Sequence, residues 1–566
     1  MDPPSPLNSL NFNVGVLGHI DSGKTSLCKA LSTVASTASF DKNPQSQERG
    51  ITLDLGFSSF CVAVPPHLQD QVSSRKIAYI QYTLVDCPGH ASLIRTIISG
   101  AQIMDLMLLI VDVTKGIQTQ TAECLVIGEI TCGSMIVVLN KTDLLPEDKR
   151  HATISKMKAR LEKVLQGTKF SGCPIVTASA NQDGEKSAIE VKELVEALSA
   201  ATFVPKRDPS GPMVFSVDHC FTIRGQGSVM TGTMLSGTAK VNDSAEIVSV
   251  KEVKKIKSMQ MFRQPVTSAM QGDRVGICVP SFDAKLLERG FVTTPNTLQT
   301  FHAAIILLQQ IPYFKQPIKT RSKFHVTVGH ETVMARVSLF TSPTSEFTYT
   351  KEYKYLEETP VDTRKAEKEN KDESEKCVFA LLEFESPVTG RNRSLIIASR
   401  LDADIHQNAC RLAFHGHILE SFTSKDYNLT PLRVYKPKEK QGTVERLQDN
   451  STVIVRNLVK KETDISKFER LRVTLSTGEL GFIEGSFGKS GKIKVRIPDG
   501  LKDSTVAFLT RGTIKKKGDL DEPCTDSAAA TSASNGSGNK SEDSVIQVKL
   551  LFKRYIYDLK KQMVQA

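Results

Sequence analysis

The chain has 566 residues, of which 40% are hydrophobic and 24% charged, a composition typical of globular proteins. Because one hydrophobic core rarely serves more than about 250 to 300 residues, the length predicts three to five domains. The eleven cysteines include no Cys-x-x-Cys pair, which argues against a zinc site or a disulfide framework and favours a reducing compartment. No apolar run reaches the roughly 18 residues of a membrane span, and the first residues lack the pattern of a signal peptide. We therefore expect a soluble, cytoplasmic protein that contacts no membrane.

Positive charge is concentrated in the C-terminal part of the chain. The net charge is +11, and residues 431–566 hold 26 Lys and Arg against 17 Asp and Glu. A basic excess at one end indicates a polyanionic partner, and RNA is the partner that we expect. The alternative is an ordinary solvated basic surface, since scattered Lys and Arg are common on soluble domains.

The segment 18–25, Gly-His-Ile-Asp-Ser-Gly-Lys-Thr, matches the P-loop pattern in full. It follows the apolar run Val14–Leu17 and precedes a segment that can open a helix, as this motif requires. The glycines let backbone N–H groups turn toward phosphate oxygens, the lysine reaches the terminal phosphates, and the threonine hydroxyl binds Mg²⁺. The nucleotide-binding residues predicted here are Asp21, Ser22, Gly23, Lys24, Thr25 and Ser26, and Thr25 is also a predicted Mg²⁺ ligand.

A second motif, Asp86-Cys87-Pro88-Gly89, follows the apolar run 82–85. An aspartate at the end of a strand can hold Mg²⁺ through water, and a glycine N–H can sense the γ-phosphate of a nucleotide. We therefore predict Asp86 as a Mg²⁺ ligand and Gly89 as a nucleotide-binding residue.

Two later motifs predict the base that is bound. Asn140-Lys141-Thr142-Asp143 ends another apolar run, and its carboxylate can accept from the ring N–H and amino group that guanine has and adenine lacks. Ser179-Ala180, after a third run, is placed to offer a backbone N–H to the guanine oxygen. The GTP-binding residues predicted from these two motifs are Asn140, Lys141, Asp143, Ser179 and Ala180. Four motifs in this order, within alternating strand and helix patterns, predict a GTPase domain with a mostly parallel sheet and flanking helices.

Changes in composition along the chain predict five parts. From residue 213 the pattern changes to short alternating runs separated by glycine-rich turns, which is typical of β-barrels. The predicted parts are a flexible leader (1–13), a GTP-binding domain (14–204), a β-barrel domain (205–300), a second β-barrel domain (301–435) with a mobile charged loop (351–376), and a basic β-rich domain (436–566) with a disordered insertion (523–544). The predicted fold class is therefore multidomain, an α/β P-loop domain followed by all-β domains, the last a small β-barrel.

Several segments resemble the motifs of translational GTPases related to elongation factor Tu. In the first domain these are 18–25, Arg49-Gly50-Ile51-Thr52, Asp86-Cys87-Pro88-Gly89-His90 and Asn140-Lys141-Thr142-Asp143. Residues 221–232, Phe-Thr-Ile-Arg-Gly-Gln-Gly-Ser-Val-Met-Thr-Gly, are similar to the signature of that family's second domain. With its additional fourth domain the chain resembles the selenocysteine-specific elongation factors of eukaryotes over essentially its whole length, because factors that deliver ordinary aminoacyl-tRNA stop after the third domain.

The resemblance implies roles for individual residues of the GTPase site. Thr52 would bind Mg²⁺ only when the γ-phosphate is present, and Ile20 and Ile51 would form an apolar gate that screens the attacking water. His90 would position and stabilise that water, since phosphoryl transfer depends chiefly on positioning and electrostatics. Asp21 would either help to bind a monovalent cation or shape the loop.

The resemblance also implies a selenocysteine pocket in the second domain, formed by Asp218, His219 and Arg274. A selenol is more acidic than a thiol, so a selenocysteinyl ester presents an anion at neutral pH and a selective pocket needs fixed positive charge. Arg274 and His219 would contact the selenolate, and Asp218 would orient or charge the histidine. The alternative is a salt bridge at the end of the barrel.

The expected function is that of a ribosome-stimulated GTP hydrolase that carries selenocysteinyl-tRNA to recoded UGA codons, with GTP or GDP and Mg²⁺ as cofactors. The expected partners are selenocysteinyl-tRNA, the ribosome and, through the fourth domain, the selenocysteine insertion element and its binding protein; the chain is expected to be a monomer. Lys515-Lys516-Lys517 is a solvated run, a phosphate contact or a signal for nuclear import.

Two other functions stay open. One is a GTPase that carries initiator tRNA, against which the basic fourth domain argues. The other is a GTP-regulated RNA-binding scaffold, against which the intact Thr52 and His90 argue, since a scaffold needs no competent hydrolytic site.

Overall fold

The computed structural model describes most of the chain. The described residues are 8–32, 34–35, 55–73, 77–89, 98, 104–179, 185–360, 377–402, 410–488, 491–515, 545–560 and 563–566. They belong to two compact units, an N-terminal unit (Met1–Leu339 with Glu357–Tyr427) and a C-terminal unit (Phe340–Leu356 with Asn428–Ala566). Among the described helices, none is both long and apolar enough to cross a membrane.

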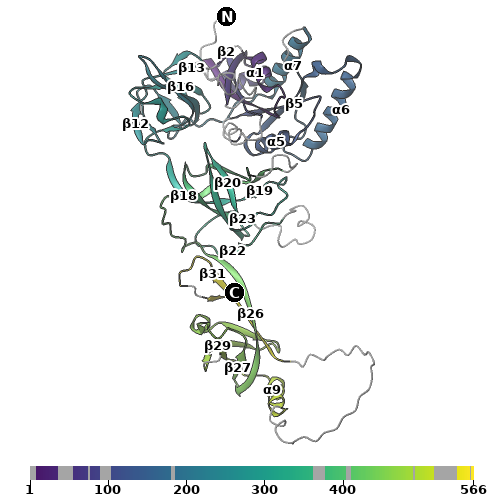
Figure 1. Cartoon of the computed structure of the whole chain (residues 1–566), viewed down its shortest axis with the longest axis vertical. Helices are drawn as coiled ribbons and strands as arrows, with labels where there is room; N and C mark the ends of the chain where they lie inside the picture. Colours follow the sequence, from purple (N-terminus) through teal and green to yellow (C-terminus); the bar gives the residue numbers. More distant parts are fainter. Residues whose placement is uncertain are drawn as a thin grey trace. The chain divides into compact units, whose positions relative to one another are not determined.

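The first domain is built on a seven-stranded sheet flanked by helices (Figure 1), with the strand order β2-β3-β4-β1-β5-β6-β7. The strands from β4 to β7 in this order are parallel, whereas β3 runs antiparallel to β4 and β2 antiparallel to β3. The strands are β1 (Ser9–Gly18), β2 (Val34–Ala35), β3 (Gly56–Ala63), β4 (Tyr79–Asp86), β5 (Leu106–Asp112), β6 (Ser134–Asn140) and β7 (Ile175–Thr177). The helices are α1 (Lys24–Leu31), α3 (Pro66–Val72), α5 (Thr119–Thr131), α6 (Glu147–Leu165) and α7 (Glu185–Ala201), with a short 3-10 helix η4 (Thr142–Leu144).

Hydrophobic side chains cover both faces of this sheet, which explains why its central strands are continuously apolar. All seven residues of β5 are buried. Because successive side chains point to opposite faces, Met107 packs in a cluster with residues of α5 and α6, and Leu108 in a second cluster with residues of α1 and α7. The parallel register then places the ends of the strands at one edge, with Asp86 opposite Val16 and Asn140 opposite Asp112.

The second domain is an eight-stranded sheet with the order β12-β11-β17-β8-β9-β16-β13-β14, beside a two-stranded sheet of β10 and β15. Its long hairpin of β8 and β9 contains the glycine-rich turn at residues 225–227. The strands are β8 (Val214–Ile223), β9 (Gly227–Ser236), β10 (Thr238–Lys240), β11 (Ser244–Ile247), β12 (Glu252–Lys255), β13 (Ser258–Met261), β14 (Gln264–Val266), β15 (Ser268–Met270), β16 (Arg274–Val279) and β17 (Gly290–Thr293), with the 3-10 helix η5 (Ala284–Leu286).

The remaining strands of the N-terminal unit have the order β20-β24-β25-β18-β23-β21, and a pairing between β20 and β21 closes them into a barrel. The strands are β18 (Gln299–Leu307), β19 (Gln309–Gln310), β20 (Lys323–Val328), β21 (Glu331–Ser342), β23 (Cys377–Gly390), β24 (Leu395–Ser399) and β25 (Leu412–Phe422). Of the predicted charged loop 351–376, residues 361–376 lie outside the described residues.

The C-terminal unit contains a closed six-stranded barrel. β26 pairs with both β27 and β31, so the order β26-β27-β30-β29-β28-β31 returns to its start. The elements are β22 (Tyr353–Leu356), β26 (Val434–Asp449), β27 (Thr452–Arg456), β28 (Arg472–Leu475), β29 (Leu480–Phe487), β30 (Lys492–Arg496), β31 (Gln547–Tyr555), β32 (Met563–Gln565), the 3-10 helix η6 (Ile465–Phe468) and α9 (Asp503–Lys515). The predicted insertion 523–544 and two residues of the lysine run, Lys516 and Lys517, lie outside the described residues. The predicted fold class, an α/β domain followed by β-rich domains, is confirmed.

Candidate functional site

The loop between β1 and α1 has the backbone of a phosphate-binding loop. Gly18 and Gly23 adopt φ values of 153° and 87°, and Asp21 between them has a φ of 58°. A Cβ atom at Gly23 would lie 2.2 Å from Nδ2 of Asn140, so glycine is required there. Because α1 begins at Lys24, the positive end of this helix adjoins the loop.

Lys24 is the cation of this loop. Its side chain is buried, and Nζ donates a hydrogen bond of 2.7 Å to the carbonyl of His19. Burial lowers the pKa of Lys24, and the carboxylate of Asp86 opposes that shift. A Cβ atom at Gly89 would lie 2.3 Å from the same Nζ, so the backbone of Gly89 lies directly against the lysine. A buried ammonium group favours an anion beside it, and a nucleotide triphosphate supplies one.

Thr25 and Asp86 bring two oxygen ligands together. Oγ1 of Thr25 donates a hydrogen bond of 2.6 Å to Oδ2 of Asp86, the last residue of β4. Hydroxyl and carboxylate oxygens are hard donors that suit Mg²⁺, so this pair fits the ion. When bound, Mg²⁺ would neutralise charge on the phosphate oxygens during transfer. The third predicted ligand, Thr52, lies outside the described residues.

The predicted guanine-binding residues lie beside the phosphate-binding loop. Nδ2 of Asn140 donates a hydrogen bond of 2.8 Å to the carbonyl of Ser22. Oγ of Ser179 donates a hydrogen bond of 3.0 Å to Oδ1 of Asp143, so the structure joins the two segments predicted to read the base. Ala180 lies outside the described residues.

Two buried polar atoms of this region are suited to bind a polar ligand. Oγ of Ser22 and Oδ1 of Asn140 have no hydrogen-bond partner among the described residues, and both side chains are almost fully buried. An unpaired buried polar group costs about 1–3 kcal/mol, so a nucleotide that bonds to these atoms would stabilise the site.

The remaining predicted residues of the GTPase site are placed only in part. Ser26 is exposed in the first turn of α1, and Ile20 of the apolar gate is half-buried. Ile51 and His90 lie outside the described residues. Lys141, a predicted GTP-binding residue, has a further contact that was not predicted: its Nζ lies 2.9 Å from Oδ2 of Asp112, at the end of the neighbouring strand β5.

The structure brings the predicted selenocysteine pocket together around Arg274. Its Nη1 donates hydrogen bonds to Asp218 and, at 3.3 Å, to Oγ1 of Thr233. The guanidinium group also stacks on Phe57 of β3 in the GTPase domain, with Cζ 3.3 Å from the ring centroid. Neither Thr233 nor Phe57 was predicted, since both partners are distant in sequence from the motif that contains Arg274.

The charged side chains of this pocket, Arg274 and Asp218, are buried. Arg274 is 5% exposed, and its Nη2 is buried with no hydrogen-bond partner among the described residues. Burial lowers the pKa of Arg274, and the adjacent Asp218 opposes the shift. Burial likewise lowers the pKa of His219, again opposed by Asp218. A cavity of about 140 Å³, lined by Phe221, Thr231 and Arg274 among others, opens beside these residues.

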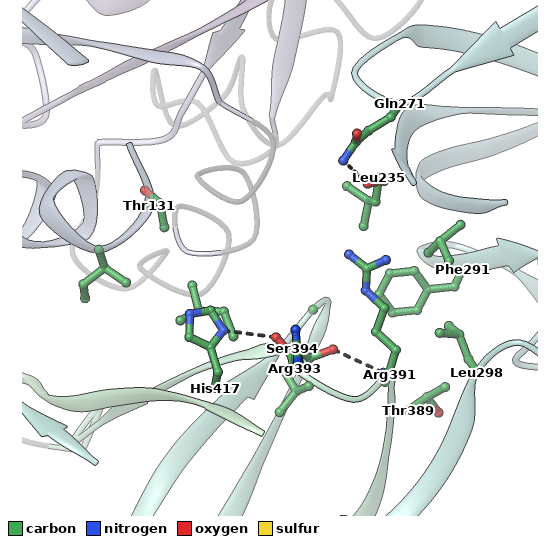
Figure 2. A pocket seen from close by; sticks show the side chains of 16 residues that line it. Thr131, Leu235, Gln271, Phe291, Leu298, Thr389, Arg391, Arg393, Ser394 and His417 are labelled. Carbon is green, nitrogen blue, oxygen red and sulfur yellow. Dashed lines mark hydrogen bonds between the residues drawn. The ribbon is translucent and has the colours of Figure 1, made fainter. Parts of the chain in front are cut away.

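A larger cavity lies where the three domains of the N-terminal unit meet (Figure 2). It has a volume of about 360 Å³, and Arg391, Arg393 and His417 lie around it with Phe291 and the end of α5. None of its lining residues is acidic. The cavity is therefore suited to an anionic group.

The C-terminal unit has a basic cleft between the end of β27 and the start of β30. Its lining includes five cations: Lys440, Arg456, Lys460, Lys461 and Lys492. Only Lys492 forms an ion pair with a described carboxylate, that of Glu445 at 2.6 Å. Burial and the neighbouring Lys460 lower the pKa of Lys440. The cleft therefore concentrates positive charge that the described part of the chain does not neutralise.

Comparisons with known proteins agree with this geometry. Residues 10–203 match the family description "Elongation factor Tu GTP binding domain" and 227–294 match "Elongation factor Tu domain 2". Residues 305–416 match "Selenocysteine-specific elongation factor, eukaryotes, 3rd domain", and residues 430–561 match "eEFSec C-terminal RIFT domain".

Whole-chain relatives extend the match. The selenocysteine-specific elongation factor of Methanocaldococcus jannaschii is 31% identical over 88% of this chain and 97% of its own. The crystal structure of elongation factor SelB from Methanococcus maripaludis, in complex with the GTP analogue GppNHp, has a TM-score of 0.64 and 27% identity over 88% of this chain and 96% of its own. The selenocysteine-specific elongation factor of Mus musculus is 52% identical over 98% of this chain and 99% of its own, and the present chain therefore belongs to the family of selenocysteine-specific elongation factors.

Proposed function

We propose that this GTP hydrolase binds selenocysteinyl-tRNA and delivers it to the ribosome at recoded UGA codons. The observation that carries the proposal is the buried Arg274, whose unpartnered Nη2 lies in the same unit as the nucleotide site. The family membership of the chain and its complete P-loop support GTP hydrolysis. The pocket around Arg274 supports selection of the selenocysteinyl group.

Nucleotide binding is derived from residues of the first domain. Lys24 and the backbone of the loop would bind the phosphates, and Thr25 with Asp86 would hold Mg²⁺. Asp143 and Asn140 would select guanine by accepting and donating hydrogen bonds at its edge. We propose that Thr52 completes the metal site and that His90 positions the attacking water, the roles that the resemblance implies.

Amino-acid selection would rest on charge. A selenocysteinyl side chain is anionic at neutral pH, whereas a seryl side chain is neutral, so a buried guanidinium group distinguishes them. Nη1 of Arg274 is already occupied by Asp218 and Thr233, which leaves Nη2 to face the ligand. We propose that His219 adds a second hydrogen bond to the selenolate, and that Asp218 orients the arginine as well as the histidine.

RNA contacts outside the amino acid are proposed for two further places. The cavity with Arg391 and Arg393 would bind phosphate of the tRNA, and the basic cleft of the C-terminal unit would contact the selenocysteine insertion element, directly or together with its binding protein. We further propose that the chain acts as a monomer in the cytoplasm, with nuclear import dependent on 515–517.

The test compares three ligands on the same tRNA body at constant salt: selenocysteinyl-tRNA, seryl-tRNA and uncharged tRNA. The GTP-loaded protein should bind the selenocysteinyl form most tightly, and Arg274→Ala should abolish that preference while the affinity for GTP is unchanged. Equal binding of the three ligands by the unchanged protein would refute the delivery function and favour an RNA-binding scaffold.

A further inference from the structure

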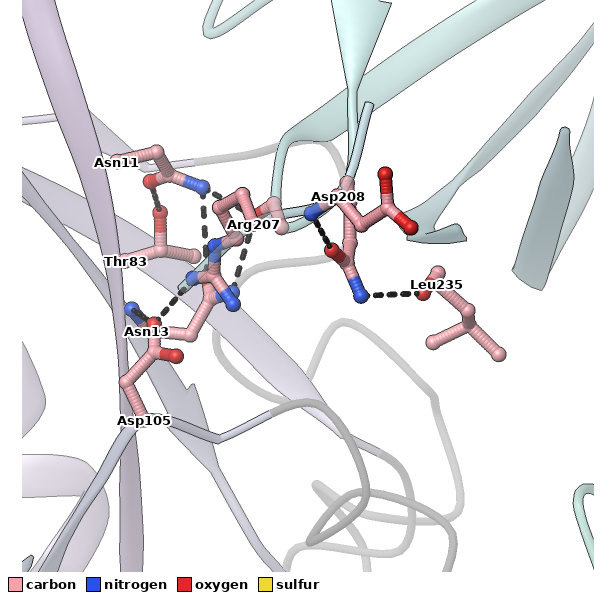
Figure 3. A network of polar contacts seen from close by, with 9 residues as sticks. Asn11, Asn13, Thr83, Asp105, Arg207, Asp208 and Leu235 are labelled. Atoms are coloured by element: carbon pink, nitrogen blue, oxygen red, sulfur yellow. Dashed lines mark hydrogen bonds and ion pairs between the residues drawn. The ribbon is translucent and has the colours of Figure 1, made fainter. Parts of the chain in front are cut away.

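The loop that leads into Arg274 is held by the GTPase domain (Figure 3). Nδ2 of Asn11 and Nδ2 of Asn13 both donate to the carbonyl of Gly272, at 2.5 Å and 2.9 Å. Both asparagines belong to β1, the strand that continues into the phosphate-binding loop, and both side chains are buried. Two donors from the GTPase domain therefore fix the carbonyl two residues before Arg274.

A second contact holds the same loop from the linker between the domains. Arg207 forms an ion pair of 2.5 Å with Asp105, which in turn accepts a hydrogen bond of 2.9 Å from the backbone N–H of Asn13. Gly272 has a φ of 92°, and a Cβ atom there would lie 2.4 Å from Nε of Arg207. The loop is thus packed against a guanidinium group that the GTPase domain itself anchors (Figure 3).

The side chain of Arg274 is held by the GTPase domain as well. Its guanidinium group lies over the ring of Phe57, which is fully buried in β3 and lies five residues after Thr52 in the sequence. Cation–π stacking is directional and strengthens in a dry site, so the ring restricts the orientation of the guanidinium group. Asp218 and Thr233 fix one edge of that group, and Phe57 fixes its face.

We infer that Asn11, Asn13 and Phe57 are positioning residues through which the GTPase domain sets the orientation of Arg274 and thereby the selectivity for the amino acid. The inference rests on the proposed function, because it requires that Arg274 read the amino acid. These three residues contact the arginine or its loop and would not contact the ligand. The aminoacyl pocket therefore belongs to two domains, since both the second domain and the nucleotide-binding domain supply contacts that orient its arginine.

The test uses the full-length, GTP-loaded chain and measures the ratio of dissociation constants for seryl-tRNA and selenocysteinyl-tRNA. Phe57→Leu should lower this ratio about 2- to 30-fold, the range typical of mutations that change the coupling to a site without contacting its ligand. The affinities for GTP and for seryl-tRNA should stay within about twofold. Phe60→Leu is the matched control, because Phe60 lies on the same strand and stacks on Tyr82 at 5.0 Å instead. The ratio of dissociation constants measured for Phe60→Leu should equal that of the unchanged protein.

The double variant Asn11→Ala/Asn13→Ala tests the loop independently of the ring. It removes both donors to the carbonyl of Gly272, and the ratio should fall while a melting curve still shows a folded chain. If the melting temperature falls and the ratio does not change in this variant or in Phe57→Leu, the residues serve only to join the domains and the inference is wrong.

Arg274→Ala separates this inference from the proposed function. If Arg274→Ala leaves the ratio unchanged, the pocket assignment itself fails. If Arg274→Ala lowers the ratio to about one but Phe57→Leu and Asn11→Ala/Asn13→Ala leave it unchanged, Arg274 reads the amino acid but the three residues do not position it. Phe57→Leu made in the Arg274→Ala chain should change the ratio no further, because the ring acts through the arginine; an additional loss would show that it acts elsewhere.

Discussion

The backbone of Gly89 lies so close to the phosphate-binding loop that there is no room for even a methyl group. A Cβ atom would lie 2.3 Å from Nζ of Lys24 and 2.8 Å from the backbone N of Ile20. Gly89→Ala should therefore displace the lysine from the phosphate site and weaken GTP binding about 10- to 100-fold, the loss expected for one charge-assisted hydrogen bond. The measurement is a titration with a fluorescent GTP analogue.

Gly133→Ala provides the control for that substitution. A Cβ atom at Gly133 meets nothing within 4 Å, so the same chemical change should leave GTP affinity within about twofold. Equal losses in the two variants would mean that the effect comes from general destabilisation and not from the lysine.

Residues of the nucleotide site could be predicted from the sequence because each motif carries its own geometry within a few residues. The bend at Gly23 follows from a glycine-rich loop after a strand. Thr25 and Asp86 then meet because β1 and β4 are parallel neighbours, so that the carboxyl ends of both strands lie at one edge of the sheet. The stacking of Arg274 on Phe57 could not be predicted, since it depends on how two domains pack and leaves no local pattern. The asparagines of β1 were missed for the same reason: their partner is a backbone carbonyl of another domain.

Helix α5 is joined to the third domain by a buried ion pair. Nε and Nη2 of Arg411 donate to the two carboxylate oxygens of Glu123, at 2.9 Å and 2.7 Å, and both side chains are at most 7% exposed. Glu123→Gln should destabilise the N-terminal unit by about 3–5 kcal/mol, because it leaves the guanidinium charge buried without a counter-ion. Urea unfolding measures the change.

The double variant Glu123→Leu/Arg411→Leu distinguishes a lost charge from lost packing. It removes both buried charges and should be less destabilised than Glu123→Gln. A double variant that is less stable than the single one would show that the pair contributes through its shape and hydrogen bonds more than through charge balance.

Short alternating runs predicted a β-rich last domain but not the pairing of its strands. Two of these strands are β28 and β30. No local pattern predicted that β22 would pair in parallel with β26, with Tyr353 opposite Val434, because the two strands lie far apart in the chain. Residues 340–356 consequently belong to the C-terminal unit, although the pattern had suggested one continuous third domain.

For the whole molecule, the asymmetry of charge has a structural counterpart. Part of the excess of positive charge in residues 431–566 lies in the basic cleft. Lys460 and Lys461 are exposed there and form no ion pair with a described carboxylate. Composition could predict a basic surface, but only the fold shows which cations converge, since this depends on where β27 ends and β30 begins.

The salt dependence of RNA binding tests this cleft. If Lys460 and Lys461 each contact a phosphate of a selenocysteine insertion element transcript, Lys460→Ala/Lys461→Ala should lower the slope of log affinity against log salt by about 1.4 to 1.8. Fluorescence anisotropy with the full-length chain measures that slope. Lys549→Ala/Lys553→Ala is the matched control, because these lysines pair with Glu439 at 3.0 Å and Glu352 at 2.9 Å. The control removes the same charge. Equal changes of the slope in both double variants would therefore show that RNA binding depends only on the net charge of the chain and that the cleft is not a binding site.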